Sequence, residues 1–187
     1  IQLLKSVWNT AKRVWSVPLP SSSPFDLVKL DKVKNQRDQV LSKEEYIRLL
    51  DCAAQSKLII LKDLIQLAYQ TAARYNEIAS LKRCDTDLQK QLATFKDTKN
   101  GEDRTIPLSN DSVKILKKYP FGETFFNITY GSFQFYWNQC RSKAGLNHFR
   151  FHDLRACAIT NMLLRGMNLA EVASISGHKS WSMLKRY

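Results

Sequence analysis

The chain has 187 residues, of which 44% are hydrophobic and 25% charged, values that are ordinary for a globular protein and sufficient for one well-packed domain with a short appendage. Its 29 lysines and arginines outnumber its 17 acidic residues. The resulting net charge of +12 favours a polyanionic partner, with nucleic acid the first expectation and an anionic membrane surface the second. No uninterrupted apolar run is long enough to span a bilayer, which argues against a membrane-spanning protein. The four cysteines match no zinc-binding spacing, which argues against a zinc-binding protein.

Basic residues gather toward both ends of the chain. Residues 1–40 contain seven lysines and arginines against three acidic residues, and residues 137–187 contain eight against two. We expect the two ends to contribute to one basic face, although a merely solvated surface would have the same composition. The sequence begins with Ile1 rather than methionine and has no signal-peptide pattern, so we expect it to be part of a longer protein.

Residues 1–16 have hydrophobic side chains near helical spacing and predict one basic amphipathic helix. Three prolines and three serines between residues 18 and 24 end this helix, and an extended basic stretch is expected to follow as far as Val40. This pattern is typical of the end of a preceding domain followed by a linker.

The remaining sequence predicts an α+β fold that is mostly helical, with one small antiparallel sheet. Ser42 and Glu45 can form a capping box at the start of the first helix of this region. Between residues 84 and 108, alternating residues and the turn signal Lys99-Asn100-Gly101 predict three strands. Further helices are predicted at about 58–71, 74–81, 110–118, 131–144, 153–165, 169–176 and 180–187, and three of them stop just before Gly145, Gly166 and Gly177.

The last forty residues contain the most informative pattern, because His152, Arg155, His178 and Tyr187 recur at spacings that helices can gather into one pocket. Arginine binds phosphate with a planar pair of donors, and fixed donors stabilise the charge that builds on the non-bridging oxygens when a nucleophile adds. Tyrosine is a weak nucleophile at neutral pH, since its ordinary pKa is about 10, but cationic neighbours or a base can activate it. The set therefore fits a site that holds a phosphodiester and attacks it with a tyrosine.

Each candidate residue has a simpler interpretation when it is considered alone. A single arginine such as Arg74 is more often a surface charge, Lys99 a solvated turn residue, and Tyr187 half-buried packing. The two histidines could cap a helix or a turn. The combined pattern favours function, because all of these independent explanations would otherwise have to hold together.

The same residues belong to a longer series of motifs along the chain. The series consists of Ala73-Arg-Tyr-Asn-Glu77, Thr98-Lys-Asn-Gly101, Arg104-Thr-Ile-Pro-Leu108, Phe151-His-Asp-Leu-Arg155, and Ser176-Gly-His178 followed nine residues later by Tyr187. In order, spacing and helix–sheet–helix pattern, it resembles the catalytic domain of the tyrosine recombinases, or phage-type integrases, over roughly residues 41–187. One departure is that Ala72-Ala73 stand where family members commonly have Gly-Leu or Gly-Ala.

The resemblance implies how the site would bind and cleave DNA. Arg74 and Arg155 would clamp the scissile phosphate, and His152 and His178 would donate further hydrogen bonds. Glu77 matches an acidic position beside the first arginine, where it would orient neighbouring groups rather than take part in the chemistry.

Two further residues complete the implied reaction. Lys99, on the turn between the second and third strands, would protonate the leaving 5′-oxygen. Tyr187 would attack phosphorus and form a 3′-phosphotyrosyl link to DNA. The family needs no metal and no other cofactor, because the covalent bond conserves the energy of the phosphodiester.

The resemblance also implies a domain organisation and a set of partners. Residues 1–16 would be the last helix of a core-binding domain that clamps DNA, residues 17–40 a basic interdomain linker, and residues 41–187 the catalytic domain. Expected partners are double-stranded DNA, other recombinase subunits in a tetramer on DNA, and accessory DNA-bending proteins, with no membrane partner, in the bacterial cytoplasm or nucleoid.

The implied function is site-specific recombination for integration or excision of a phage or mobile element. Two alternatives stay open. One is DNA relaxation like that of a type IB topoisomerase, which shares this chemistry. The other is a DNA-binding module without catalysis, against which the complete set of site residues argues.

Overall fold

The computed structural model describes residues 1–28, 39–96, 103–180 and 183–184. Lys99 and Tyr187 therefore lie outside the described residues. The chain divides into two units, Ile1–Arg37 and Asp38–Tyr187. Among the described residues, no helix is both long enough and apolar enough to cross a membrane.

The described part of the first unit consists of helix α1 (Gln2–Arg13) and a segment that folds back onto it. The rings of Trp8 and Phe25 meet edge to face, with their centroids 6.2 Å apart. The helix is shorter than the predicted 1–16, because the chain turns away at Ser16, where φ is 53°. The assignment of this unit to a preceding domain and a linker stays a prediction.

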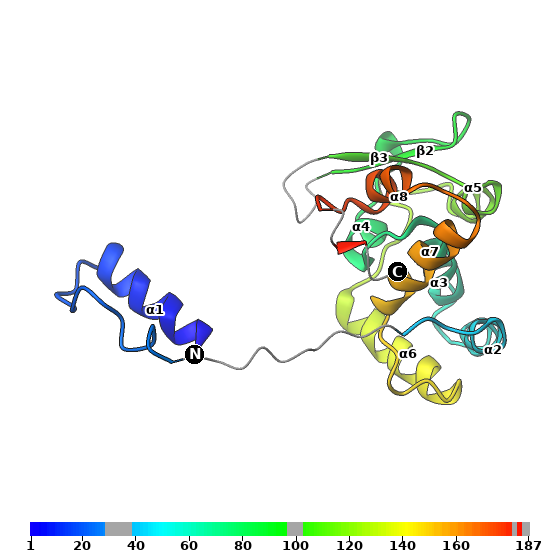
Figure 1. Ribbon diagram of the computed structural model, residues 1–187. Helices are drawn as coiled ribbons and strands as arrows, with labels where there is room; N and C mark the ends of the chain where they lie inside the picture. Colours follow the sequence, from blue (N-terminus) through cyan, green and yellow to red (C-terminus); the bar gives the residue numbers. More distant parts are fainter. Residues whose placement is uncertain (29–38, 97–102, 181–182, 185–187) are drawn as a thin grey trace. The chain divides into compact units, whose positions relative to one another are not determined.

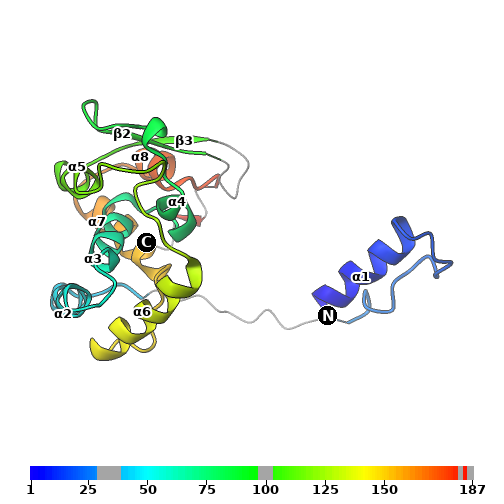
Figure 2. The same ribbon diagram turned by 180° about the vertical axis from the view of Figure 1, so that it is seen from behind.

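The second unit is mostly helical with one small sheet (Figures 1 and 2). Its described helices are α2 (Lys43–Ala54), α3 (Leu61–Thr71), α4 (Tyr75–Ala79), the 3-10 helix η1 (Arg83–Asp85), α5 (Asn110–Lys117), α6 (Tyr130–Lys143), α7 (Asp153–Leu164) and α8 (Leu169–Ser176). Its described strands are β1 (Thr86–Asp87), β2 (Leu92–Phe95) and β3 (Arg104–Pro107). The predicted α+β fold with a three-stranded antiparallel sheet is confirmed.

The strands lie in the order β1-β2-β3, and neighbouring strands are antiparallel. Ala93 pairs with Ile106, and both are fully buried. The next pair, Thr94 and Thr105, lies on the other face, with the two hydroxyls 2.8 Å apart. Successive residues of a strand point to opposite faces, so one face of the sheet packs on the core and the other is open.

The predicted capping signals set several helix ends. Ser42 Oγ accepts from the Glu45 amide at 3.2 Å and the Ser42 amide donates to the Glu45 carboxylate at 2.9 Å, which confirms the capping box of α2. Gly145, Gly166 and Gly177 follow α6, α7 and α8 with φ values of 73°, 87° and 71°. These left-handed conformations confirm that the three glycines end their helices.

Helix α3 is the centre of the core and contacts α2, α4, α5, α6 and α7. Its buried apolar side chains are Leu61, Leu64, Ile65, Leu67 and Ala68. In both views the sheet lies on one side of the helical bundle next to α8, while α2 and α6 lie on the opposite side (Figures 1 and 2). The short helix α4 and helix α7 thus both pack on α3, and α8 contacts both β3 and α7.

In the second unit, α3 and α4 differ from their predicted ranges by more than one residue. Helix α3 begins at Leu61 rather than near residue 58, because Ser56 Oγ accepts from the Leu58 amide at 3.2 Å and the chain turns there. Helix α4 ends at Ala79, where the Ser80 hydroxyl donates to the Asn76 carbonyl at 2.7 Å. The predicted helix over 180–187 lies largely outside the described residues.

Candidate active site

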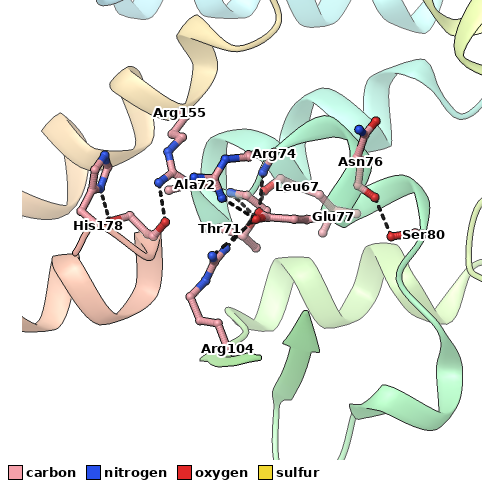
Figure 3. A network of polar contacts seen from close by, with 12 residues as sticks. Leu67, Thr71, Ala72, Arg74, Asn76, Glu77, Ser80, Arg104, Arg155 and His178 are labelled. Carbon is pink, nitrogen blue, oxygen red and sulfur yellow. Dashed lines mark hydrogen bonds and ion pairs between the residues drawn. The ribbon is translucent and has the colours of Figure 1, made fainter. Parts of the chain in front are cut away.

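Arg74 stands directly before α4, and Glu77 holds it in place from the first turn of that helix (Figure 3). Glu77 Oε2 accepts from the Arg74 amide at 2.8 Å, and Oε1 accepts from Arg74 Nη1 at 2.6 Å. The side chain of Glu77 is 6% exposed and that of Arg74 is 24% exposed. The carboxylate therefore fixes both the start of α4 and the direction of a partly exposed guanidinium.

A second guanidinium, that of Arg104 on β3, binds the same carboxylate (Figure 3). Arg104 Nη2 lies 3.0 Å from Glu77 Oε2, and the Arg104 side chain is 9% exposed. Burial alone would raise the pKa of Glu77, but hydrogen bonds from the Arg74 amide and from Arg104, together with the charge of Arg104, hold this pKa below its ordinary value. Glu77 is therefore ionised at neutral pH although it is buried.

Arg155 is buried in the first turn of α7 and donates to two backbone carbonyls. Its Nη1 lies 2.7 Å from the Ala72 carbonyl oxygen, and its Nη2 donates to the carbonyl oxygen of Ser176 at the end of α8. Ala72 is left-handed, with φ 54°, a conformation that glycine adopts more readily than alanine. Arg155 thus joins the turn before Arg74 to the end of α8.

His178 follows Gly177, the residue that ends α8, and its ring is held by Ser176. Ser176 Oγ lies 2.6 Å from the Val172 carbonyl oxygen and 2.7 Å from His178 Nδ1. A carbonyl can only accept, so the single hydroxyl hydrogen goes to Val172 and the Nδ1–H of the ring donates to Oγ. In the neutral ring Nε2 is then the unprotonated nitrogen, which can accept a proton, and in the imidazolium form it donates.

His152 lies directly before α7 and is exposed. It borders a cavity of about 400 Å³ together with Ala73, the residue before Arg74. The cavity wall combines aromatic and cationic side chains, and its other members are Tyr75, Tyr130, Phe133, Gln134, Trp137, Arg141, Arg150 and Phe151. His152 therefore opens onto a cavity next to Arg74, whereas Arg155 is buried.

Lys99 and Tyr187 lie outside the described residues, so their roles stay predictions. The strands on either side of Lys99 are described, and Arg104 at the start of β3 reaches Glu77. Near the other end of the chain, Leu184 is 1% exposed and belongs to a small buried cluster with Ala72. The described neighbours of both residues therefore lie in the same part of the structure as Arg74 and Arg155.

The sequence reasoning missed the contributions of Arg104 and Ser176. Arg104 belongs to one of the recognised motifs, but its pairing with Glu77 joins residues that are 27 positions apart and depends on the folded sheet. Ser176 had a usable signal, because it lies next to the Gly177-His178 pair and one helical turn after Val172. A serine at that place can bond both the helix and the histidine.

A model of the phage integrase family matches residues 39–187. This match covers most of the sequence, and the chain therefore belongs to the phage integrase family.

Curated relatives have related names. The shufflon-specific DNA recombinase of Escherichia coli is 34% identical over 190 residues, which cover 100% of this chain and 49% of that protein. The tyrosine recombinase XerA of Saccharolobus solfataricus is 27% identical over 154 residues, which cover 80% of this chain and 52% of that protein. The chain thus spans about half the length of the curated relatives it matches.

Solved structures share the fold. The catalytic domain of bacteriophage HP1 integrase has a TM-score of 0.67 and 25% identity, over 79% of this chain and 85% of that one. A lambda integrase dimer bound to a core site has a TM-score of 0.75 and 21% identity, over 96% of this chain and 70% of that one. Both agree with the helical bundle and small sheet of the second unit.

Proposed function

We propose that the chain is the catalytic part of a site-specific DNA recombinase that cleaves and rejoins strands through a 3′-phosphotyrosyl intermediate. The observation that carries this proposal is the meeting of Arg74, Arg155 and His178 at adjoining ends of α4, α7 and α8 (Figure 3), in a protein with a net charge of +12. The relatives are named as recombinases, and a structural neighbour is bound to a core site, which supports duplex DNA as the substrate.

In the proposed reaction, Arg74 and Arg155 bind the non-bridging oxygens of the scissile phosphate. His152 and His178 add hydrogen bonds to the same group. Both arginines are anchored before substrate arrives, Arg74 by Glu77 and Arg155 by two carbonyls. Donors that are held in advance stabilise the developing charge without a further cost of reorganisation, which supports a clamping role.

Tyr187 supplies the nucleophile and Lys99 the acid. The Tyr187 Oη bonds to phosphorus, the bond from phosphorus to the 5′-oxygen breaks, and Lys99 transfers a proton to that oxygen. The phenolic proton passes to Nε2 of His178, because Nδ1–H is used on Ser176, and only the imidazolium formed in this step donates a hydrogen bond from Nε2 to the phosphate. Rejoining runs the same steps in reverse, so the proposal requires no metal and no cofactor.

The proposal extends to the rest of the chain and to its partners. Residues 1–16 end a core-binding domain, residues 17–40 form a basic linker, and residues 41–187 form the catalytic domain. The active assembly is a tetramer of recombinase subunits on DNA, aided by accessory DNA-bending proteins, in the bacterial cytoplasm or nucleoid. Its biological role is integration or excision of a phage or mobile element.

Covalent capture on DNA tests the proposal. A nicked duplex with a randomised central sequence loses a short strand after cleavage, so rejoining fails and the protein stays attached. We expect the full chain to form a complex that resists detergent and whose DNA reveals the preferred site. Tyr187→Phe should form none, and an adduct made by this variant as fast as by the parent would refute the assignment of the nucleophile.

Four further measurements test the proposal against its alternatives. A chelator should leave capture unchanged, and strong inhibition would indicate a metal-dependent nuclease. Arg74→Ala and Arg155→Ala should abolish cleavage while largely keeping duplex affinity. A loss of affinity as large as the loss of cleavage would show that these arginines only contact the DNA backbone. Affinity should fall steeply with salt, and relaxation of plasmids without sequence preference would indicate a topoisomerase.

A further inference from the structure

We propose that Arg104 is a positioning residue of the active site, which neutralises the buried Glu77 carboxylate so that Arg74 keeps its positive charge for the scissile phosphate. The proposal rests on the function proposed above. It assigns a role to a residue outside the set of Arg74, Lys99, His152, Arg155, His178 and Tyr187. Contacts of Arg104 to three elements of the fold carry it.

Glu77 receives both guanidinium groups at once (Figure 3). Arg104 approaches with two nitrogens, Nη2 at 3.0 Å from Oε2 and Nη1 at 3.5 Å from Oε1, while Arg74 Nη1 lies 2.6 Å from Oε1. Two positive charges therefore share one negative charge. The cluster of three side chains retains a net charge of +1.

This charge balance decides what a phosphodiester meets at Arg74. If Arg74 and Glu77 stood alone, they would form a neutral pair, and opposite charges in contact largely cancel for a third ion nearby. Arg104 neutralises the Glu77 carboxylate and is the more buried of the two arginines, because its side chain is 9% exposed and that of Arg74 is 24% exposed. The more exposed arginine is thereby left with the charge that binds an anion.

Two other residues fix the Arg104 guanidinium. Its Cζ lies 5.2 Å from the centroid of the Phe95 ring on β2. On another side it approaches Gly177, where an added Cβ would lie 2.5 Å from Nη1 and 3.3 Å from Cδ and Cζ. Gly177 directly precedes His178, so Arg104 connects the sheet, α4 and the backbone that carries the histidine.

Stability alone is a poor explanation for this arrangement. Buried ion pairs often contribute no more to stability than apolar side chains of similar size. A role through charge makes a specific prediction that a packing role does not make. Removing Arg104 should be harmful mainly while Glu77 still carries its negative charge.

This prediction can be tested by measuring the rate of single-turnover cleavage of a nicked duplex that carries the site found by covalent capture. Arg104→Gln should slow cleavage by roughly 10- to 100-fold, the usual effect of losing a group that orients a reacting residue, with little change in duplex Kd. A double variant that also carries Glu77→Gln lacks one charge of each sign, and the glutamine keeps an acceptor for the α4 cap. This double variant should recover most of the lost rate.

Two more variants calibrate the result. Arg104→Lys keeps the charge but not the paired nitrogens, so we expect a loss smaller than that of Arg104→Gln. Lys114→Gln removes an exposed charge from α5, where the side chain is 74% exposed, and should cleave like the parent. If Arg104→Gln does not fold, the double variant and Arg104→Lys carry the same comparison.

Either of two results would overturn the proposal. One is parental cleavage by a folded Arg104→Gln variant. The other is a double variant that is as slow as the single one, because Arg104 would then act in some way other than through the charge of Glu77. A parent protein that forms no covalent adduct would instead refute the proposed function, and the role of Arg104 with it.

Discussion

Replacing Gly177 by alanine should destabilise the fold through two separable effects. The residue has φ 71°, a left-handed conformation that costs alanine about 1–2 kcal/mol. The new Cβ would also lie 2.5 Å from Arg104 Nη1, so the guanidinium must shift, and we expect this shift to break one of its contacts with Glu77. Losing one charge-assisted hydrogen bond there adds about 1.5–3 kcal/mol. We therefore expect the free energy of unfolding to fall by about 2.5–5 kcal/mol.

Equilibrium unfolding in urea measures this change, and the chain offers a matched control. Gly145 has φ 73°, but a Cβ there would have no neighbouring atom within 4 Å. Gly145→Ala should therefore lower the free energy of unfolding only through the strained backbone, by about 1–2 kcal/mol. In an Arg104→Ala background, Gly177→Ala should also fall to this lower figure, which leaves a coupling of about 1.5–3 kcal/mol between the two positions.

Two results would refute this reasoning. Gly177→Ala and Gly145→Ala would have the same cost if the contact with Arg104 were unimportant. The cost of Gly177→Ala would also be unchanged by Arg104→Ala if the displaced side chain were not the cause.

Three other predictions concern titration, thiol reactivity and the histidine. Glu77 has a lowered pKa in the folded protein, so it contributes stability that is present above its unfolded pKa of about 4.3 and lost as the pH falls through the folded value. Acidification should therefore destabilise Glu77→Gln less than the parent in urea unfolding, and equal slopes would contradict this. At pH 8 an alkylating reagent should modify exposed Cys84 in the native protein but not buried Cys140. Burial raises the pKa of Cys140 to about 12, so about one Cys140 side chain in ten thousand is a thiolate at this pH. Mass spectrometry of the labelled peptides checks both sites. Ser176→Ala should free the His178 ring and slow cleavage by roughly tenfold at unchanged duplex affinity, whereas a parental rate would show that the Ser176 contact does not hold the ring in its working tautomer.

Local signals explain why much of the fold was predictable. The capping box at Ser42 and Glu45 and the stop at Gly177 each depend on residues close together in sequence, and both are seen. The early end of α4 was not predicted, because the Ser80 hydroxyl competes for a helix carbonyl and periodicity does not register this. Helix type was therefore easier to predict than helix length.

The candidate site was predictable where motifs name residue types, and not where the fold brings side chains together. The motifs indicated Arg74, Arg155 and Glu77, and the structure places them around the turn at Ala72 (Figure 3). The second partner of Glu77 was not foreseen, because the motif that contains Arg104 does not indicate which residue this arginine contacts. That pairing exists only after β3 has reached α4.

The way in which Arg155 is held has an evolutionary consequence. Two of its acceptors are main-chain carbonyls, those of Ala72 and Ser176, and no substitution of a side chain can delete a carbonyl. Such an anchor tolerates sequence drift as long as the backbone keeps its path, which depends on the left-handed residues Ala72 and Gly177. The Arg155 anchor is thus most sensitive to substitutions that change the backbone at Ala72 and Gly177.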